Sequence, residues 1–251
     1  LLSIIGATLL GACATGRNAT EPVGTSLDAS KIRAESTTPN LASLTLSDAK
    51  EMVGAPAYLS AKQLAAMRPM PTQEVRALDF EVTSDGEAEK LRSTMQFTAI
   101  QDGLEFTDHS VAPRGADPGL HETSIAIFGL PTALYWNGLR AEAGHPQSSL
   151  PNTVRLISGR PFDPKSSFVI ERTAPDESVS VHTCHPAESF PATTLNTLLS
   201  GMVIMFECIT SPYQIRSKYW YLSDAQRYIT HEVFVRDWLQ ARIKLIAVHL
   251  R

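Results

Sequence analysis

The chain has 251 residues, of which 43% are hydrophobic and 19% charged, and this composition is typical of a folded protein rather than a disordered one. Its length suits one sizeable β domain or two small ones. The net charge is −4 and no run of Lys or Arg occurs, which argues against a nucleic-acid-binding protein.

The first thirteen residues combine a short apolar run, small residues and a cysteine. Leu1 to Leu10 is shorter than the roughly 20 apolar residues that span a bilayer, and it is typical of the apolar part of a secretory signal. Leu10-Gly11-Ala12-Cys13 resembles the lipobox of bacterial lipoproteins: an aliphatic residue, two small residues and a cysteine. The resemblance implies removal of residues 1–12 as a signal peptide and acylation of Cys13, with palmitate among the chains. A plain signal peptide that contains a cysteine is the alternative.

The residue after the cysteine bears on the membrane that would hold the anchor. In the lipoprotein family, Asp at this place is the usual signal for retention in the inner membrane, and this chain has Ala14. The resemblance therefore implies an outer-membrane lipoprotein of a Gram-negative bacterium that faces the periplasm. No later stretch is long and apolar enough for a membrane span, so we expect membrane contact through Cys13 alone.

Residues 13–44 are expected to form the lipidated cysteine and a flexible tether. The segment is rich in Ala, Thr, Ser, Asn and Pro, and it has no apolar periodicity with which to bury surface. Residues 45–74 predict a short helical segment. One helix is expected over residues 49–53, preceded by Thr45-Leu-Ser-Asp48 and ended by Gly54 and Pro56. A second is expected to start at Ser60, where Ser60-Ala-Lys-Gln63 matches a capping box.

Residues 75–251 predict a mainly β domain. Apolar and polar residues alternate in short stretches separated by turn signals about every ten residues, which is typical of an antiparallel meander. We expect it to form a curved sheet or a partly open barrel. The predicted strands are 78–82, 95–99, 104–107, 123–128, 134–136, 153–158, 167–172, 178–184, 202–206, 216–222, 229–235 and 242–250, with a short helix as the alternative for the last.

Part of this domain resembles a known group of proteins. Over Leu156 to Ile229 the chain carries a glycine before a strand (Gly201), then Tyr219-Trp220-Tyr221, then a strand that begins Arg-aromatic-aliphatic. This order resembles the β-meander of uncharacterised periplasmic lipoproteins of Gram-negative bacteria. The chain departs from that pattern at Leu199-Ser200-Gly201, where Pro-Ala-Gly is usual, and at Asp224, where Pro is usual. The resemblance implies no catalytic residues.

The cysteines predict a disulfide. If Cys13 is acylated, Cys184 and Cys208 remain as an even pair in an oxidising compartment. Their bond would close a loop of about 25 residues and stabilise the fold by roughly 3 kcal/mol. Two buried free thiols are one alternative. A metal site at His182, Cys184 and His185 is another, but a structural zinc site needs a fourth ligand and no CxxC-type partner exists.

Motifs for catalysis or cofactor binding are absent from the sequence. Its seven His residues form no HExxH, and the chain has no GxSxG, GxGxxG or GxxxxGK[ST]. Glu207 and Glu232, on strands predicted to be neighbours, are a conceivable acid/base pair, although carboxylates on solvent faces of strands are far commoner. We therefore expect no catalytic residues, no metal and no cofactor.

Four aromatic residues are the candidates for a ligand surface: Tyr219, Trp220, Tyr221 and Tyr228. One face of a curved sheet can line a cavity, and the alternative is a core of large side chains with tyrosine hydroxyls bonded at its rim. The sequence thus favours a non-enzymatic, membrane-anchored periplasmic lipoprotein that binds an envelope partner or an apolar ligand. The alternative is a periplasmic hydrolase whose site is not visible as a motif.

Overall fold

The computed structural model describes residues 45–83, 91–99, 104–112, 120–131, 133–138, 147–149, 153–174, 177–235 and 238–251. Two α-helices, α1 (Leu46–Val53) and α2 (Ala55–Ala65), precede the strands. The strands are β1 (Val75–Thr83), β2 (Leu91–Ala99), β3 (Glu105–Ala112), β4 (Leu120–Ala126), β5 (Ala133–Gly138), β6 (Gln147–Ser149), β7 (Thr153–Gly159), β8 (Phe168–Thr173), β9 (Val179–Pro191), β10 (Met202–Ser211), β11 (Ile215–Leu222), β12 (Arg227–Val235) and β13 (Trp238–Leu250). A 3-10 turn, η3 (Ala192–Thr194), follows β9.

The strands form one antiparallel meander, which confirms the predicted fold class. Their order in the sheet is β6-β5-β4-β3-β2-β1-β13-β12-β11-β10-β9-β8-β7. The first and last strands pair in the middle of this order, with Leu78 opposite Val248. The consecutive strands β6 and β7 lie at its two edges, so the sheet is open between them.

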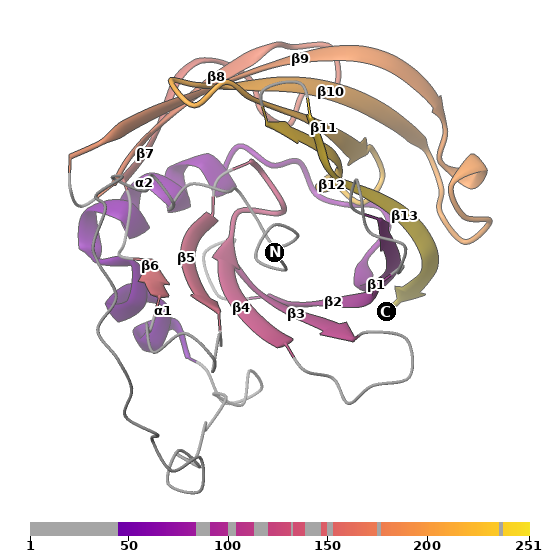
Figure 1. Ribbon diagram of the computed structural model, residues 1–251, viewed down its shortest axis with the longest axis horizontal. Coiled ribbons are helices and arrows are strands. Elements are labelled where there is room, and N and C mark those ends of the chain that lie inside the picture. The colour runs from indigo at the N-terminus through magenta and orange to yellow at the C-terminus, as the bar shows by residue number, and fades with distance from the viewer. Residues whose placement is uncertain are drawn as a thin grey trace, which may run out of the picture.

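The two helices lie beside this opening. The strands curl around the molecule, and α1 and α2 occupy the side where β7 and β5–β6 approach each other (Figure 1). Helix α2 packs against β7, and α1 packs against α2 and β5. The buried residues of α2 are mostly alanines, together with Tyr58 and Leu64, which allows this helix to approach the sheet closely.

The start of α2 differs from the prediction. The helix begins at Ala55, with Gly54 as its N-cap and Pro56 in its first turn. Proline is well suited to that place because its missing N–H has no intrahelical partner there. Ser60 is therefore inside the helix, where its hydroxyl donates to the Pro56 carbonyl oxygen at 3.0 Å, and the expected capping box is wrong. Two further elements, β6 and η3, lie in stretches predicted as loops or left unassigned.

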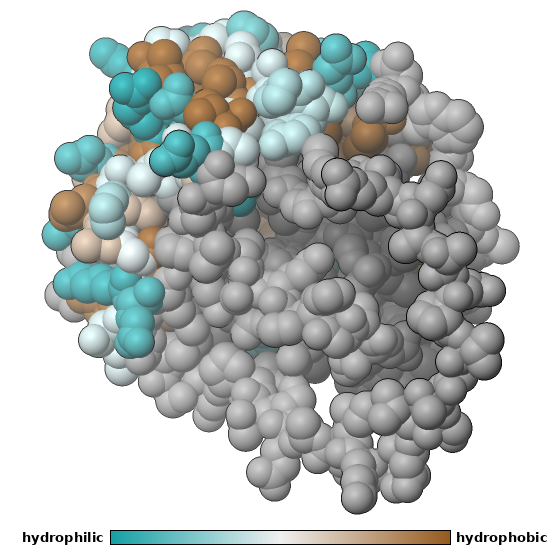
Figure 2. All heavy atoms as spheres, turned by 60° about the vertical axis from the view of Figure 1, so that its left-hand side comes forward, coloured by the Kyte–Doolittle hydropathy of each residue, from teal (hydrophilic) through white to brown (hydrophobic). Residues whose placement is uncertain are grey.

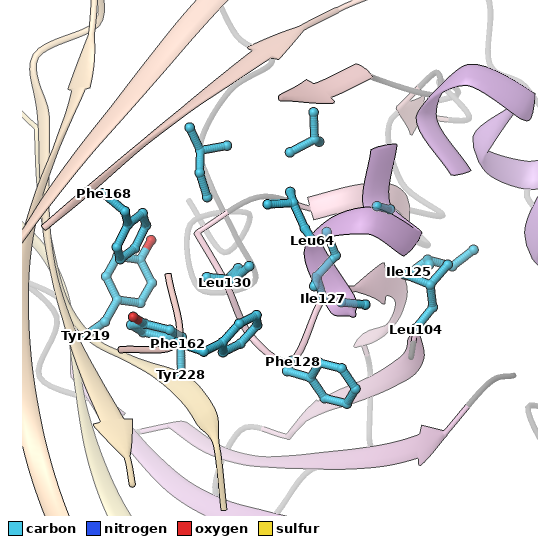
Figure 3. Close-up of a cluster of buried hydrophobic side chains, with 14 of the residues drawn as sticks. Leu64, Leu104, Ile125, Ile127, Phe128, Leu130, Phe162, Phe168, Tyr219 and Tyr228 are labelled. Carbon is cyan, nitrogen blue, oxygen red and sulfur yellow. The ribbon is translucent and has the colours of Figure 1, made fainter. Parts of the chain in front are cut away.

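The first hydrophobic core joins the helices to both halves of the sheet. It contains apolar residues of α1 and α2, Phe106 of β3, Ile125 of β4, and a row of aromatic residues on β8 to β12. Figure 3 shows these side chains converging from the two sides: Phe168, Tyr219 and Tyr228 on one, Leu64, Leu104 and Ile125 on the other, and Phe128 and Leu130 between them. The helices and the sheet therefore share one core.

A second core lies around the strands that meet at the centre of the sheet order. Leu78 and Phe80 of β1 and Ile243 and Leu245 of β13 pack there with Trp220 and other residues of β10 to β12. The end of β11 belongs to both cores: Tyr219 and Tyr221 lie in the first, and Trp220 and Leu222 in the second. These four consecutive residues are at most 6% exposed, so this part of the sheet is buried on both faces.

A tight turn after β4 fixes the spacing between β12 and the first core. The Tyr228 N–H donates to the Phe128 carbonyl oxygen at 3.0 Å. Gly129 follows with a φ of +71°, and a Cβ at this position would collide with the backbone carbonyl of Tyr228. Only glycine meets both the left-handed backbone and the close approach.

Candidate functional site

The residues predicted to carry the anchor and the disulfide fall in different parts of the chain. Cys13 lies outside the described residues. Cys184 of β9 and Cys208 of β10 are direct register partners, and their sulfurs are bonded at 2.04 Å. Both are buried in the first core. The sequence therefore predicted the correct cysteine pair.

The metal alternative for this stretch is wrong because its three side chains do not converge. Cys184 is bonded to Cys208, His182 is buried, and His185 is exposed with its Nδ1 2.8 Å from the Ser167 hydroxyl. Within the described ranges, no group of three or more His, Cys, Asp or Glu side chains is placed to hold a metal ion.

The four aromatic candidates are core residues. Tyr219, Trp220, Tyr221 and Tyr228 are at most 6% exposed, and none lines a cavity described below. The Tyr221 hydroxyl donates to the Phe162 carbonyl oxygen at 3.0 Å, and the Tyr228 hydroxyl donates to that of Pro161. Trp220 stacks on His231 with ring centroids 4.0 Å apart. These residues therefore form part of a core of large side chains, with the Tyr221 and Tyr228 hydroxyls hydrogen-bonded, which is the alternative that the sequence analysis left open.

Glu207 and Glu232 do not form an acid/base pair. They lie on β10 and β12, and Lys218 of the intervening β11 is the register partner of both. Glu232 instead bonds to Arg242 at 2.7 Å and to Lys218 at 3.3 Å. Burial alone would raise the pKa of Glu232, but these hydrogen bonds outweigh it and lower the pKa, so this carboxylate stays charged. The two strands that carry them, expected to be neighbours, are separated by β11 in the sheet, and solvent-facing carboxylates were already the commoner interpretation.

A groove with a volume of about 500 Å³ lies between α2 and the edge strand β7. We call it the α2 groove. One wall is formed by α2 and the turn that follows it, and the other by β7 and two residues of β8. The α2 wall consists of Ser60, Gln63, Leu64 and Met67, and the strand wall consists of Thr153, Val154, Arg155, Leu156, Glu171 and Thr173. Its volume is within the range of about 300–1,000 Å³ that is usual for ligand sites.

The α2 groove combines an apolar floor with a charged rim. Leu64 and Val154 are 3% and 1% exposed, whereas Met67 is 43% exposed. Arg155 and Glu171 form an ion pair at 3.0 Å across β7 and β8. Figure 2, which brings the side of the molecule with α1, α2 and β7 forward, shows apolar residues interspersed with polar ones on its described surface.

A second hollow continues the α2 groove beyond the end of the helix. It has a volume of about 220 Å³ and is lined by Met67, Pro69 and the connection between β7 and β8, residues 160–163. Met67 lines both hollows. An extended, partly apolar surface therefore follows the open side of the sheet.

A serine and a histidine meet in a small internal cavity. The Ser93 hydroxyl is hydrogen-bonded to Nε2 of His109, and the two residues are 3% exposed each. The cavity that they line with apolar residues of β1, β12 and β13 has a volume of about 40 Å³. This volume has room for a few water molecules and is far below that of an ordinary substrate site.

An ion pair lies at one end of the second core. Arg227 contacts Glu105, and its guanidinium lies 3.6 Å from the Phe97 ring centroid. Arg68 lies near by, over the Phe128 ring, and donates to the carbonyl oxygens of Ala225 and Gln226. Burial and the charge of Arg227 lower the pKa of Arg68 to about 10, so the Arg68 guanidinium is charged at neutral pH. The hollow between them is only about 70 Å³ in volume.

The α2 groove escaped sequence analysis because its walls are far apart in the sequence. Its only local signals are the polar and apolar mixture of residues 60–67 and the weakly alternating strand at residues 153–159. Neither indicates which edge of the sheet is left open.

Among the described helices, none is long and apolar enough to cross a membrane.

Comparison with known proteins adds one distant structure. No protein-family model matches the sequence, and no curated protein matches it. Among solved structures, the chain is similar to a DUF1329 family protein from Desulfovibrio piger, with 11% identity, 78% of this chain and 94% of that chain covered, and a TM-score of 0.31. The function below is therefore argued from the chain's own residues.

Proposed function

We propose that this chain is a lipid-anchored protein of the bacterial envelope that binds a partner protein through the α2 groove. The α2 groove is the observation that carries the binding role. It is open, about 500 Å³ in volume, and lined by a helix and an edge strand rather than by a closed core. An apolar floor with a polar rim is the arrangement expected of a protein-binding surface.

The anchor and its compartment rest on the N-terminal sequence. Leu10-Gly11-Ala12-Cys13 supports acylation of Cys13, and the Cys184–Cys208 bond is consistent with an oxidising compartment. By resemblance to lipoproteins, Ala14 favours the outer membrane, facing the periplasm. The 31 residues that separate Cys13 from Thr45 would let the domain reach roughly 30 Å from its anchor if they behave as a random coil.

A partner protein suits the geometry better than the two other candidates. The aromatic residues proposed to contact an apolar ligand are packed into the cores. The hydrolase alternative finds its best serine–histidine pair, Ser93 and His109, in a cavity of about 40 Å³. The α2 groove, in contrast, is accessible.

Site-specific crosslinking in the native envelope tests the proposal. A photoreactive residue at Gln63, which lines the α2 groove, should give a discrete crosslinked product. The matched control is Ile246 of β13, which is 46% exposed and lies away from α2, and it should not give that product. Met67→Glu should abolish the product because it places a charge in the α2 groove. Equal products at both positions, or a product insensitive to Met67→Glu, would contradict the proposal.

A further inference from the structure

The face of β8 to β11 that carries the disulfide changes from apolar to polar along the strands. Phe168, Cys184 and Cys208 are register partners in one row of the first core. Two residues further along these strands the row is Ile170, His182 and Thr210, and beyond it Arg172 pairs with Ser180. Because side chains two apart share a face, all these residues lie on the same side of the sheet.

This polar group is buried. His182 is 1% exposed, Thr210 5%, Ser180 6% and Arg172 8%. Ser217, the register partner of Cys208 on β11, is also buried on this face. Buried polar side chains normally have all their hydrogen-bonding needs met, so each atom in such a group can be followed to a partner.

One nitrogen of His182 has no such partner. Its Nδ1 lies 3.0 Å from the Thr210 hydroxyl, whereas its Nε2 is buried without any hydrogen bond. Burial, and then the charge of Arg172, lower the pKa of His182 to about 4, so the ring is neutral at neutral pH. When Thr210 donates to Nδ1, the single ring proton sits on Nε2, which is then a buried donor with no acceptor.

The surrounding groups match one kind of acceptor. A guanidinium, an imidazole N–H and hydroxyl groups are donors that bind carboxylate and phosphate oxygens. Val154, the register partner of Arg172 on β7, lines the α2 groove, so this site lies one strand in from a solvent-accessible surface.

We propose that Arg172 and His182 bind an oxyanion, a carboxylate or phosphate group, through the Arg172 guanidinium and His182 Nε2. The oxyanion is either a free small ion or the headgroup of an anionic amphiphile. This site goes beyond the proposed function, since it requires neither the lipid anchor nor a partner protein in the α2 groove.

Nuclear magnetic resonance of the histidine rings in the full chain tests the site, with inorganic phosphate, acetate and dodecyl phosphate as probes. At least one probe should shift the His182 signals saturably and raise the pKa of His182, because a nearby anion favours the charged ring. Arg172→Met should weaken that binding at least tenfold. The exposed His185 is the matched control: its signals should stay unchanged, and His185→Asn should bind the probe as the unaltered protein does.

The probes distinguish the two sources of the oxyanion. Dodecyl phosphate binding at least tenfold tighter than inorganic phosphate assigns the site to an amphiphile headgroup, and equal binding assigns it to a free ion. If Arg172→Met fails to fold, Arg172→Lys keeps the charge while losing the planar fork, and binding should again weaken. A His182 signal unmoved by every probe, or binding that these variants leave unchanged, overturns the proposal.

Discussion

The Arg227 guanidinium donates to both carboxylate oxygens of Glu105, with both distances 2.6 Å. The two residues are 122 positions apart in the sequence and link β12 to β3, and their side chains are 6% and 2% exposed. Phe97 covers the guanidinium from one side. This pair therefore joins the N-terminal and C-terminal halves of the sheet at a buried point.

Removing one partner of this pair should be strongly destabilising. We expect Glu105→Ala to lower the free energy of unfolding by about 3–5 kcal/mol, because it leaves the Arg227 charge buried and unpaired. The double variant Glu105→Leu with Arg227→Met should lose less than Glu105→Ala, since no charge remains. Urea unfolding followed by circular dichroism measures both. A single variant as stable as the unaltered protein would contradict the buried pair.

The tyrosine cluster should make the fold sensitive to alkali. Burial raises the pKa of Tyr219 to about 12, and burial also raises the pKa of Tyr221 and Tyr228 above the usual value of about 10. The folded state thus holds protons that the unfolded state releases near pH 10. The resulting stability is complete below pH 10 and is lost as the pH rises toward 12 and beyond.

An alkaline titration checks this relation. Tyrosinate absorbance from the cluster should rise together with the loss of native circular dichroism. The variant Tyr219→Phe should show a shallower fall in unfolding free energy between pH 10 and 12. Full ionisation of the three tyrosines in a protein that keeps its native circular dichroism spectrum would contradict their burial in the folded state.

The disulfide should be resistant to alkylation until it is reduced. Cys184 and Cys208 are 24 positions apart in the sequence. Loss of the bond between them should lower the free energy of unfolding by about 2–4 kcal/mol, because the unfolded chain then gains entropy. Mass spectrometry after alkylation of the unfolded, unreduced protein should find neither residue labelled. The double variant Cys184→Ala with Cys208→Ala measures the stability change in urea. Ready labelling without reductant would show that the pair is not bonded.

Gly129 should tolerate no side chain. An added Cβ collides with the Tyr228 carbonyl, and the φ of +71° is unfavourable for other residues. We therefore expect Gly129→Ala to lower the free energy of unfolding by about 1–3 kcal/mol or more. Ser200→Ala, an exposed substitution in the connection before β10, should change stability by less than 1 kcal/mol and serves as the control. Equal unfolding midpoints for the two variants would rule out the tight turn.

The lipid anchor is tested by the cysteine itself. Mass spectrometry of the full-length protein from a Gram-negative host should find Cys13 at the mature N-terminus with acyl chains attached. Cys13→Ser should release the protein from the membrane fraction, while Cys184→Ala with Cys208→Ala should leave it there. An unmodified Cys13 in the mature protein excludes the anchor.

Sequence periodicity predicted the strands better than the site. Residues 78–82 and 167–172 alternate clearly and form β1 and β8, because one face of each is buried. Tyr219-Trp220-Tyr221 was correctly predicted to lie in a strand, but its sequence does not say that both faces are covered. That burial depends on pairing between β1 and β13, whose residues are far apart in the sequence. The α2 groove likewise depends on a contact between α2 and β7, which are far apart in the sequence.

The strand β13 holds the two halves of the sheet together. The strands from β1 to β6 and those from β7 to β12 form two arms, and β13 is the strand that joins them. It pairs with β1 on one side and with β12 on the other. Deletion of Trp238–Leu250, the 13 residues of β13, would therefore expose the facing edges of β1 and β12 and separate the two arms.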